Sequence, residues 1–182
     1  EEQFVGGGDA WRPVGSAAVR AYVERYAPWL FDRERPVVVD VCLDALELVD
    51  SLAAAVALGS VVVIDYGDEA AELYGAHRPQ GTVQAIRDHV QVDDVLADPG
   101  AQDITASVNF TAIADRARER GFAVSELVSQ SAFLARWGVV ELAARPSASI
   151  EERAAAKALL VPTGYGSVFR VLELERTQSR SR

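Results

Sequence analysis

The stretch that decides the fold is Ser60-Val61-Val62-Val63-Ile64, which is followed directly by Asp65-Tyr66-Gly67. Its consecutive β-branched residues predict a β-strand, because branched side chains pack well on a pleated surface. A continuous apolar run, unlike an alternating one, is typical of a strand buried on both faces in a parallel sheet. The sequence therefore predicts a central strand over 60–64 that ends at Asp65.

The residues before this strand predict a βαβ unit. Pro36 precedes another β-branched run, Val37 to Cys42, which favours a second buried strand. Between the two runs, apolar residues recur at helical spacing over 43–58, and Gly59 is expected to end that helix. A strand, a helix and a strand with short connections almost always form a right-handed crossover, so the two strands should be parallel neighbours.

The rest of the chain predicts one α/β domain over 1–176, followed by a disordered polar tail at 177–182. Residues 68–105 show little periodicity, and we expect them to form a long inserted loop. Capping residues and apolar periodicity predict helices at 16–26, 109–120, 131–137 and 149–160, and strands at 122–127 and 168–174.

Charge and cysteine content exclude several classes of function. The 182 residues carry a formal net charge of −9, which argues against nucleic-acid binding because nothing would neutralise the phosphates. The single cysteine, Cys42, favours a reducing compartment, which we take to be the cytoplasm, and we expect its side chain to be buried. No apolar stretch is long enough to span a membrane, and the absence of methionine suggests a trimmed or partial sequence.

The candidate site is the segment Asp65-Tyr66-Gly67. In open parallel sheets, ligands bind beyond the carboxyl ends of the strands, which is where this segment should lie. An acid and a phenol there can orient a basic substrate, and a glycine lets the backbone turn sharply or approach a ligand. The alternative is an ordinary turn in which backbone N–H groups satisfy the Asp65 carboxylate.

Other chemistries find little support in the sequence. His77 and His89 are the only histidines, so the chain lacks the ligand set of the usual zinc sites, and we expect no bound metal. The aspartates near His89 match no calcium-loop spacing, and a solvated acidic loop is the simpler interpretation. The chain has neither a nucleophile-elbow nor a phosphate-binding-loop motif, and the glycines at 6–8 follow no predicted strand.

An ordered series of motifs extends over roughly residues 36–174. It consists of Val63-Ile64-Asp65-Tyr66-Gly67, Gly81-Thr82, His89, Asp98-Pro99-Gly100, Asp103-Ile104-Thr105, Val108-Asn109-Phe110, Ser129-Gln130, Phe133-Leu134 and the closing segment 162–172. The series resembles the C-terminal half of the MidA-like family of S-adenosylmethionine-dependent methyltransferases. Single motifs are weak, but the set in this order is fairly specific.

The resemblance implies a Rossmann-like methyltransferase fold, of which this chain would be the C-terminal part. That part would have a mostly parallel sheet, an antiparallel final strand and a long inserted loop. The implied cofactor is S-adenosylmethionine, bound mainly by a glycine-rich loop and an acidic residue that this chain lacks. Because half a Rossmann sheet exposes an edge strand, we expect a larger polypeptide or a partner to complete it.

Two positions depart from the family pattern. The usual Gly-Thr-Leu is Gly81-Thr82-Val83 here, and Ile86 stands where the family has a tyrosine. The geometry on the substrate side is therefore less well defined by the resemblance than the fold is.

The reaction implied by the resemblance is methyl transfer to a protein nitrogen, such as the guanidinium of an arginine. Asp65, Asp103 or a carboxylate in the absent half of the fold can pair with that cation, and Tyr66 can stack on it. His89 can take up the released proton. The catalytic candidates are thus Asp65, Tyr66 and His89, and the substrate-binding candidates are Gly67, Asp103, Asn109 and Gln130.

Some of these residues have structural alternatives. Asp103 can cap a turn, Asn109 can cap the helix that follows it, and His89 can be a satisfied polar residue. The chain itself has alternatives to a methyltransferase with a protein substrate. It can be a non-catalytic assembly or interaction module, or another Rossmann-like enzyme such as a dehydrogenase, and association as a homodimer stays open.

Overall fold

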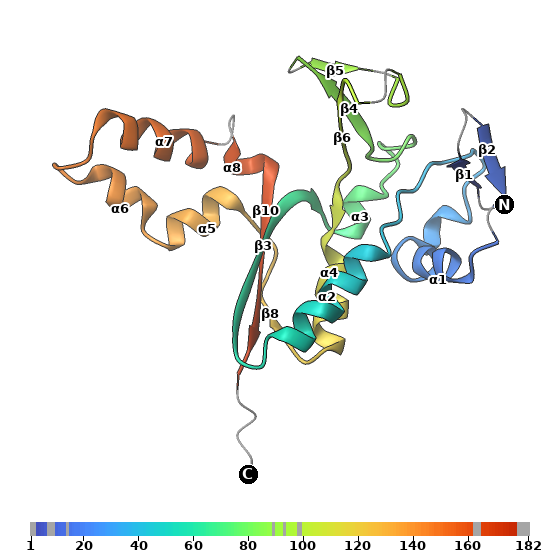
Figure 1. Ribbon diagram of the computed structural model, residues 1–182, viewed down its shortest axis with the longest axis horizontal. Coiled ribbons are helices and arrows are strands. Elements are labelled where there is room, and N and C mark those ends of the chain that lie inside the picture. The colour runs from blue at the N-terminus through green and yellow to red at the C-terminus, as the bar shows by residue number, and fades with distance from the viewer. Residues whose placement is uncertain are drawn as a thin grey trace, which may run out of the picture. The chain divides into compact units, whose positions relative to one another are not determined.

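The computed structural model describes residues 3–6, 10–13, 15–88, 90–92, 94–97, 100–161 and 165–177, with the backbone alone for 3–6, 10–13 and 165. The chain divides into two compact units. The first comprises Glu1–Leu43 and Glu69–Ser107, and the second comprises Asp44–Asp68 and Val108–Arg182 (Figure 1). The expected single domain over 1–176 stays a prediction, because two compact units can belong to one domain. Among the described residues, no helix is both long and apolar enough to span a membrane.

The second unit is built on a five-stranded sheet. Its long strands, β3 (Gly59–Asp68) and β10 (Phe169–Arg176), pair antiparallel. β7 (Val108–Asn109) pairs in parallel with the end of β3, while β8 (Ala123–Val124) and β9 (Val128–Ser129) pair antiparallel with β10. The antiparallel final strand is confirmed. Because β10 has antiparallel partners on both of its edges, this part of the sheet is more antiparallel than the sequence predicted.

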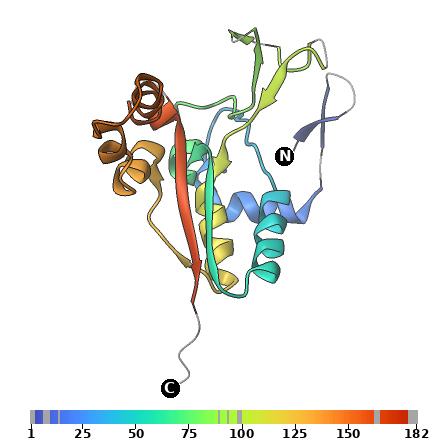
Figure 2. The same cartoon turned by 60° about the vertical axis from the view of Figure 1, so that its left-hand side comes forward.

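Two helices, α2 (Asp44–Ala55) and α4 (Phe110–Glu119), cover one face of the β3–β10 pair (Figure 2). A hydrophobic cluster joins them to the sheet, and Val61 and Val63 of β3 pack against it. We call this side of the strand pair the closed face. The buried members of the cluster are Val49, Phe110, Ile113, Ala114, Ala117, Phe122, Leu172 and Leu174.

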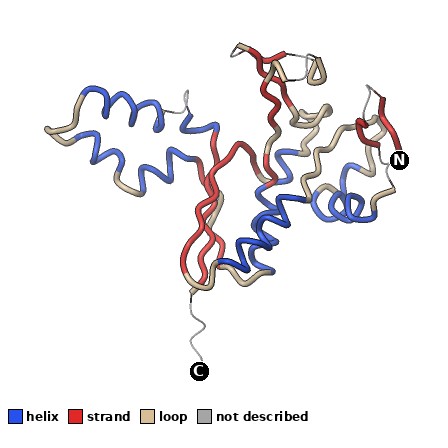
Figure 3. The backbone as a smooth tube through the Cα atoms, in the orientation of Figure 1, coloured by secondary structure: helices blue, strands red, loops and turns tan. Residues whose placement is uncertain are grey.

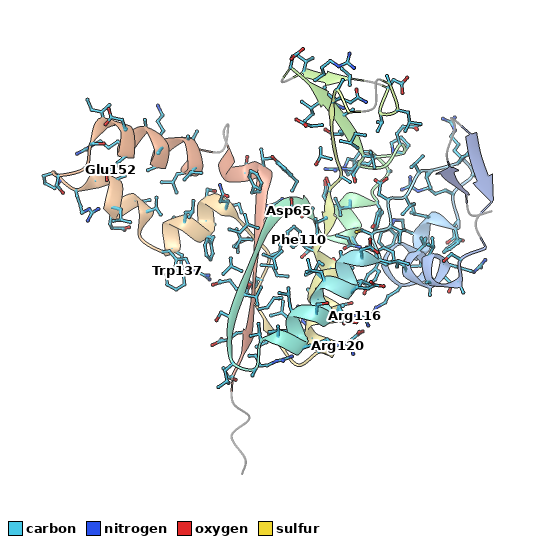
Figure 4. The ribbon with its side chains drawn as sticks, viewed as in Figure 1. Asp65, Phe110, Arg116, Arg120, Trp137 and Glu152 are labelled. Carbon is cyan, nitrogen blue, oxygen red and sulfur yellow. The ribbon has the colours of Figure 1, made fainter. Side chains whose placement is uncertain are left out.

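Ion pairs between charged side chains also connect α2 to α4. Arg120 donates two hydrogen bonds to the Asp50 carboxylate, at 2.7 and 3.0 Å, and Arg116 Nε lies 3.1 Å from Asp50 Oδ1 (Figure 4). The hydrogen bond from Arg120 and the charge of both arginines hold the pKa of Asp50 below its ordinary value. The same hydrogen bond raises the pKa of Arg120.

Arg176, the last residue of β10, fastens the ends of both helices. Its Nη1 donates to the carbonyls of Ala53 and Val56 at the end of α2, at 2.6 and 2.8 Å. Its Nη2 donates to the carbonyl of Arg120, and the guanidinium lies 4.3 Å from the centre of the Phe122 ring. The carbonyls that end α2 are therefore satisfied by a side chain from the sheet.

The opposite side of β3 is exposed. Val62, Ile64 and Tyr66 alternate with the closed-face residues of β3, and 46%, 45% and 39% of their surfaces remain accessible. In β10, Val171 lies opposite Ile64, faces the same way and is fully buried, and α5 and α8 contact that strand. We call Val62, Ile64 and Tyr66 the open face.

Four short helices lie on the other side of the strand pair from α2 and α4 (Figure 3). They are α5 (Gln130–Arg136), α6 (Val139–Ala144), α7 (Ile150–Leu160) and α8 (Tyr165–Val168). The capping box predicted for α7 is confirmed, because Ser149 and Glu152 exchange side-chain to backbone hydrogen bonds at 2.7 and 3.1 Å.

The first unit consists of short elements. β1 (Gln3–Gly6) and β2 (Ala10–Pro13) form an antiparallel pair, followed by α1 (Ala17–Tyr26) and the 3-10 turn η1 (Pro28–Leu30). After α3 (Ala70–Leu73), the strands β4 (Gln84–Arg87), β5 (Val90–Val92) and β6 (Asp103–Thr105) form an antiparallel sheet in the order β5-β4-β6. The segment predicted as a long loop over 68–105 therefore contains a small sheet.

The strand predicted from Val37 to Cys42 is wrong. No ladder forms there among the described residues, and the backbone makes isolated hydrogen bonds, from Val38 N–H to the Pro79 carbonyl and from the Tyr74 hydroxyl to the Asp40 carbonyl. A β-branched run favours extended backbone, but a strand also needs a neighbour to pair with. The predicted βαβ crossover is consequently absent, and Cys42 is exposed rather than buried.

Other elements agree with prediction to within a few residues. The helices α1, α2, α4, α5 and α7 are confirmed, and Ser16 and Asn109 cap α1 and α4. The predicted strand at 122–127 shrinks to β8, while α6 and β9 were not predicted. The expected tail beyond Thr177 and the turn at 162–164 lie outside the described residues.

Candidate functional site

The candidate site is the end of β3, where three strands meet in the second unit. Tyr66 lies opposite Phe169 at the start of β10, and Gly67 and Asp68 lie beside β7. β3 is longer than predicted, so Asp65-Tyr66-Gly67 belongs to the strand and does not follow it. The reason is that β10 and β7 supply partners up to Asp68, beyond the apolar run that the sequence prediction used.

Gly67 is required by the close approach of β7. A Cβ atom at this position would lie 2.9 Å from the Val108 nitrogen and closer still to its carbonyl oxygen, and 3.0 Å from the Phe110 ring. Its φ of +158° also disfavours a side chain. The space that we predicted for a substrate at Gly67 is therefore filled by backbone.

Asp68 forms an ion pair at this edge that the sequence analysis did not predict. Arg170 Nη2 donates to Asp68 Oδ2 at 2.6 Å, with both side chains partly buried. Within β10, Arg170 lies opposite Asp65 on one side and Ser129 on the other. The signal available in the sequence was an arginine between two apolar residues, Phe169 and Val171, at the start of the final strand.

An aromatic pair lies one register position away, on the other face of the strand pair from Arg170. The rings of Tyr66 and Phe169 stack with their centres 4.3 Å apart and an interplanar angle of 29°. Tyr66 belongs to the open face, so part of its ring stays accessible. Phe169 was not among the predicted residues, although the alternation of the final strand places it on the same face as Val171.

Asp65 and Asn109 have partners that match their structural alternatives. The Asp65 carboxylate accepts a hydrogen bond from the Tyr66 N–H at 2.7 Å, as expected for an acid satisfied by backbone (Figure 4). Asn109 is buried, and its side chain accepts from the Ala112 N–H at 3.2 Å as the cap of α4. In register, Asn109 lies beside Asp68, so the cap of α4 and the end of β3 share one position in the sheet.

The remaining predicted residues are less closely associated with this edge. Gln130 begins α5 and directly follows Ser129, the partner of Arg170 in β9. Asp103 belongs to the first unit, where it is exposed in β6 opposite Ile86. His89 lies outside the described residues.

A second polar cluster lies in the first unit and explains the Gly81-Thr82 motif. The Thr82 N–H and hydroxyl both donate to Asp40 Oδ2, the latter at 2.9 Å, and the Ser107 N–H donates to the Thr82 hydroxyl at 3.1 Å. A Cβ at Gly81, where φ is +77°, would lie 2.8 Å from Asp40 Oδ2. Thr82 is buried, so this motif holds a turn against the segment that contains Asp40.

The fold and the edge together define an α/β protein of the Rossmann-like class, with polar side chains at the carboxyl ends of its parallel strands β3 and β7. The family model for putative S-adenosyl-L-methionine-dependent methyltransferases matches residues 6–128. The chain belongs to that family, and the MidA-like resemblance is confirmed.

Two solved relatives have this fold. A likely methyltransferase of Burkholderia thailandensis, bound to S-adenosyl-homocysteine, is 29% identical, with a TM-score of 0.78 over 92% of this chain and 43% of its own. An uncharacterised protein of the same superfamily and organism is 29% identical, with a TM-score of 0.78 over 92% of this chain and 45% of its own.

A curated relative is the mitochondrial protein arginine methyltransferase NDUFAF7 of Danio rerio. It is 29% identical over 103 residues, which are 56% of this chain and 22% of the relative. The chain thus spans less than half the length of each of these three relatives.

Proposed function

We propose that this chain forms the acceptor-binding side of an S-adenosylmethionine-dependent methyltransferase that modifies a protein nitrogen, with arginine as the preferred acceptor. Membership of the methyltransferase family supports the reaction class. The name of the Danio rerio relative supports an arginine in a protein as the acceptor. The edge of β3 supports the same acceptor on chemical grounds.

The observation that carries the proposal is that this edge already binds a guanidinium. Arg170 donates to the Asp68 carboxylate at 2.6 Å, and the stacked rings of Tyr66 and Phe169 lie one register position away in the same two strands. A carboxylate and an accessible aromatic ring are the groups that recognise a guanidinium, through a charge-assisted hydrogen bond and a cation–π contact. A substrate arginine would exploit the same chemistry, with Asp65 as a second carboxylate in the same strand.

We propose that the described residues form only part of the cofactor site. Gly67 leaves no room for a ligand, because Val108 and Phe110 fill the position of its absent side chain. Gly7 and Gly8 lie outside the described residues. S-adenosylmethionine supplies the methyl group in this family, and we propose that residues beyond this chain hold most of it.

The residues of this chain would then bind the acceptor and accept the proton that it loses on methylation. A guanidinium nitrogen must lose a proton when it is methylated, and a nearby carboxylate favours the cation before the reaction and can accept the proton afterwards. Asp65 and Asp68 are the described candidates for this role. His89 is a further candidate and stays a prediction.

A methylation assay tests the proposal. The protein to assay is a chimera of this chain and the Burkholderia relative. This chain replaces the segment of the relative that it matches, and the rest of the relative is kept in its own order. We expect transfer of labelled methyl from S-adenosylmethionine to an arginine peptide, and a loss of about 100-fold in Asp68→Asn, since charged hydrogen bonds contribute about 1.5–3 kcal/mol. Transfer to a lysine peptide with equal efficiency, or full activity in Asp68→Asn, would reject the arginine assignment.

A second candidate is a non-catalytic interaction module, and the exposed apolar residues of the open face favour it. Calorimetry separates the two functions. We expect the 182-residue chain alone to show no tight binding of S-adenosylmethionine. Micromolar affinity would contradict our placement of the cofactor site, while a chimera that binds the cofactor but methylates nothing would favour the module.

A further inference from the structure

We infer that Arg170 is an internal competitor of the acceptor arginine: it occupies the Asp68 carboxylate until the acceptor displaces it, and it thereby sets the affinity of the site. The inference rests on the proposed function, because it takes a guanidinium as the acceptor. Its first tests measure the binding of a small guanidinium to the 182-residue chain and need no methyl transfer.

Arg170 is held by fewer hydrogen bonds than the arginines that stabilise the second unit. Among the described residues, its guanidinium makes one, from Nη2 to Asp68 Oδ2 at 2.6 Å, and 33% of the side chain is accessible. Arg120 donates two hydrogen bonds to the Asp50 carboxylate, and Arg176 donates to three carbonyls. An incoming guanidinium can form two parallel hydrogen bonds with a carboxylate, so it can replace a single one.

The backbone of Arg170 is fixed, so only its side chain can move. β10 pairs with β3 from Gly59 to Tyr66, and within that ladder Arg170 lies opposite Asp65, with Ser129 of β9 on its other side. Residues that lie opposite each other in an antiparallel pair have Cβ atoms about 4.5–5.5 Å apart, which puts the Asp65 carboxylate within reach of the guanidinium. Arg170 can therefore exchange one carboxylate for another without losing an ionic partner.

The Asp65 carboxylate is available for this exchange. It accepts a hydrogen bond from the Tyr66 N–H at 2.7 Å, and in the described part of the chain no arginine or lysine pairs with it. Two carboxylates and one guanidinium leave one negative charge at this edge at neutral pH, which matches the charge of one acceptor arginine. When the acceptor binds Asp68 and Arg170 turns to Asp65, each cation has a carboxylate as its partner.

A titration of the 182-residue chain with methylguanidinium, followed by NMR, is the first test. The amide signals of Gly67 and Asp68 report binding, and the guanidinium signals of Arg170 report its release. We expect both sets of signals to shift over the same concentration range in the parent protein. Arg170→Met keeps an apolar stem but removes the competing cation, so it should bind methylguanidinium about tenfold more tightly.

Two controls separate competition from a general change of charge. Methylammonium has the same charge but lacks the planar fork of donors, so Arg170→Met should change its affinity by less than about threefold. Arg136 pairs with Glu173 of β10 and not with Asp68, so Arg136→Met should leave the affinity for methylguanidinium unchanged at the Asp68 amide. Asp68→Asn should abolish the gain produced by Arg170→Met.

Several results would overturn the inference. Binding of methylguanidinium near Asp68 without any shift of the Arg170 signals would show that the two do not compete, and this measurement on the parent protein needs no substitution. An unchanged affinity in Arg170→Met would show the same. Equal tightening for methylammonium would mean that the site responds to charge alone.

The chimera gives an independent kinetic readout. Arg170→Met should lower KM for an arginine peptide by about tenfold with kcat nearly unchanged, because it removes a competitor of the bound acceptor and no group that acts in the transition state. A raised KM would overturn the inference. A chimera that transfers no methyl group would reject the proposed function, while the titrations of the chain alone would still decide whether Arg170 competes for Asp68.

Discussion

The two faces of the β3–β10 pair have similar residues and opposite surroundings. On the closed face, Val63 and Leu172 pack beneath α2 and α4, and Leu172 is 2% accessible. On the open face, Val62 and Ile64 of the same apolar run are nearly half accessible. A β-branched run alone therefore establishes the strand, while the neighbouring elements decide which of its side chains contribute to stability.

The difference also means that the two faces of one strand contribute differently to folding and to association. Burial of apolar surface on the closed face supplies folding free energy, at about 25 cal/mol per Å². The open face has the same chemistry but gains little from folding, so its apolar character points to association. Substitutions that act on one face and spare the other can break this interpretation.

The largest expected effect comes from truncation on the closed face. Leu172→Ala should lower the free energy of unfolding by about 2–5 kcal/mol, because it leaves a cavity between the sheet and the helices. Val62→Ala on the open face is the control and should change it by less than about 0.5 kcal/mol. Chemical denaturation measures both, and equal losses would show that the two faces do not differ as described.

A smaller effect should follow from Gly67→Ala at the end of β3. The added Cβ meets the backbone of Val108, so β7 must move, at a cost of about 1–3 kcal/mol. Gly121→Ala is the matched control, because Gly121 has a φ of +84° but no neighbouring atom within 4 Å of the position that a Cβ would take. If thermal unfolding shows the same loss for both, backbone conformation rather than the approach of β7 explains Gly67.

Removing the cap of α4 should weaken the cover of the closed face. Asn109→Ala should destabilise the protein by about 1 kcal/mol, since the Ala112 N–H loses its acceptor. Asn109→Ser should retain most of the stability, because a serine hydroxyl can also cap the helix. Equal melting temperatures for Asn109→Ala and the parent protein would show that the cap contributes nothing.

The smallest effect concerns pH and the link between α2 and α4. The pKa of Asp50 is lowered in the folded protein, so its ionised form adds stability above the ordinary pKa of 3.8, and this contribution is lost as the pH falls through the folded pKa. Asp50→Asn should therefore be less stable than the parent protein at neutral pH and equal to it in strong acid. Asp115→Asn, which removes an ion pair within α4, is the control in a series of denaturation curves against pH. A stability difference that persists unchanged into strong acid would contradict the role assigned to Asp50.

Local signals in the sequence predicted the helices well. Ser16, Asn109 and Ser149 are helix caps because their side-chain oxygens accept nearby N–H groups, and this interaction depends on neighbours in sequence. The strands depended on partners that local patterns do not reveal. Val37 to Cys42 has the composition of a strand but no ladder among the described residues, whereas Asp65 to Asp68 lies in a strand because β10 and β7 pair with it.

The same limit applies to the candidate site. Tyr66 was predicted from its position after the apolar run, and the structure places it at an edge rich in polar groups. Asp68 and Arg170 were missed because 102 positions separate them in the sequence and only the register of β10 on β3 brings them together. Close backbone contact accounts for Gly67, and helix capping, the alternative given for Asn109, accounts for that residue, while their roles in substrate binding stay predictions.

Cleavage after Arg176 by a protease can report on the contact between β10 and α2. A trypsin-like protease cleaves after an arginine only when the side chain can enter the protease's acidic specificity pocket. In the folded protein the Arg176 guanidinium is engaged by the carbonyls of Ala53 and Val56. The rate of cleavage after Arg176 should therefore report how often the C-terminal end of β10 separates from the C-terminal end of α2.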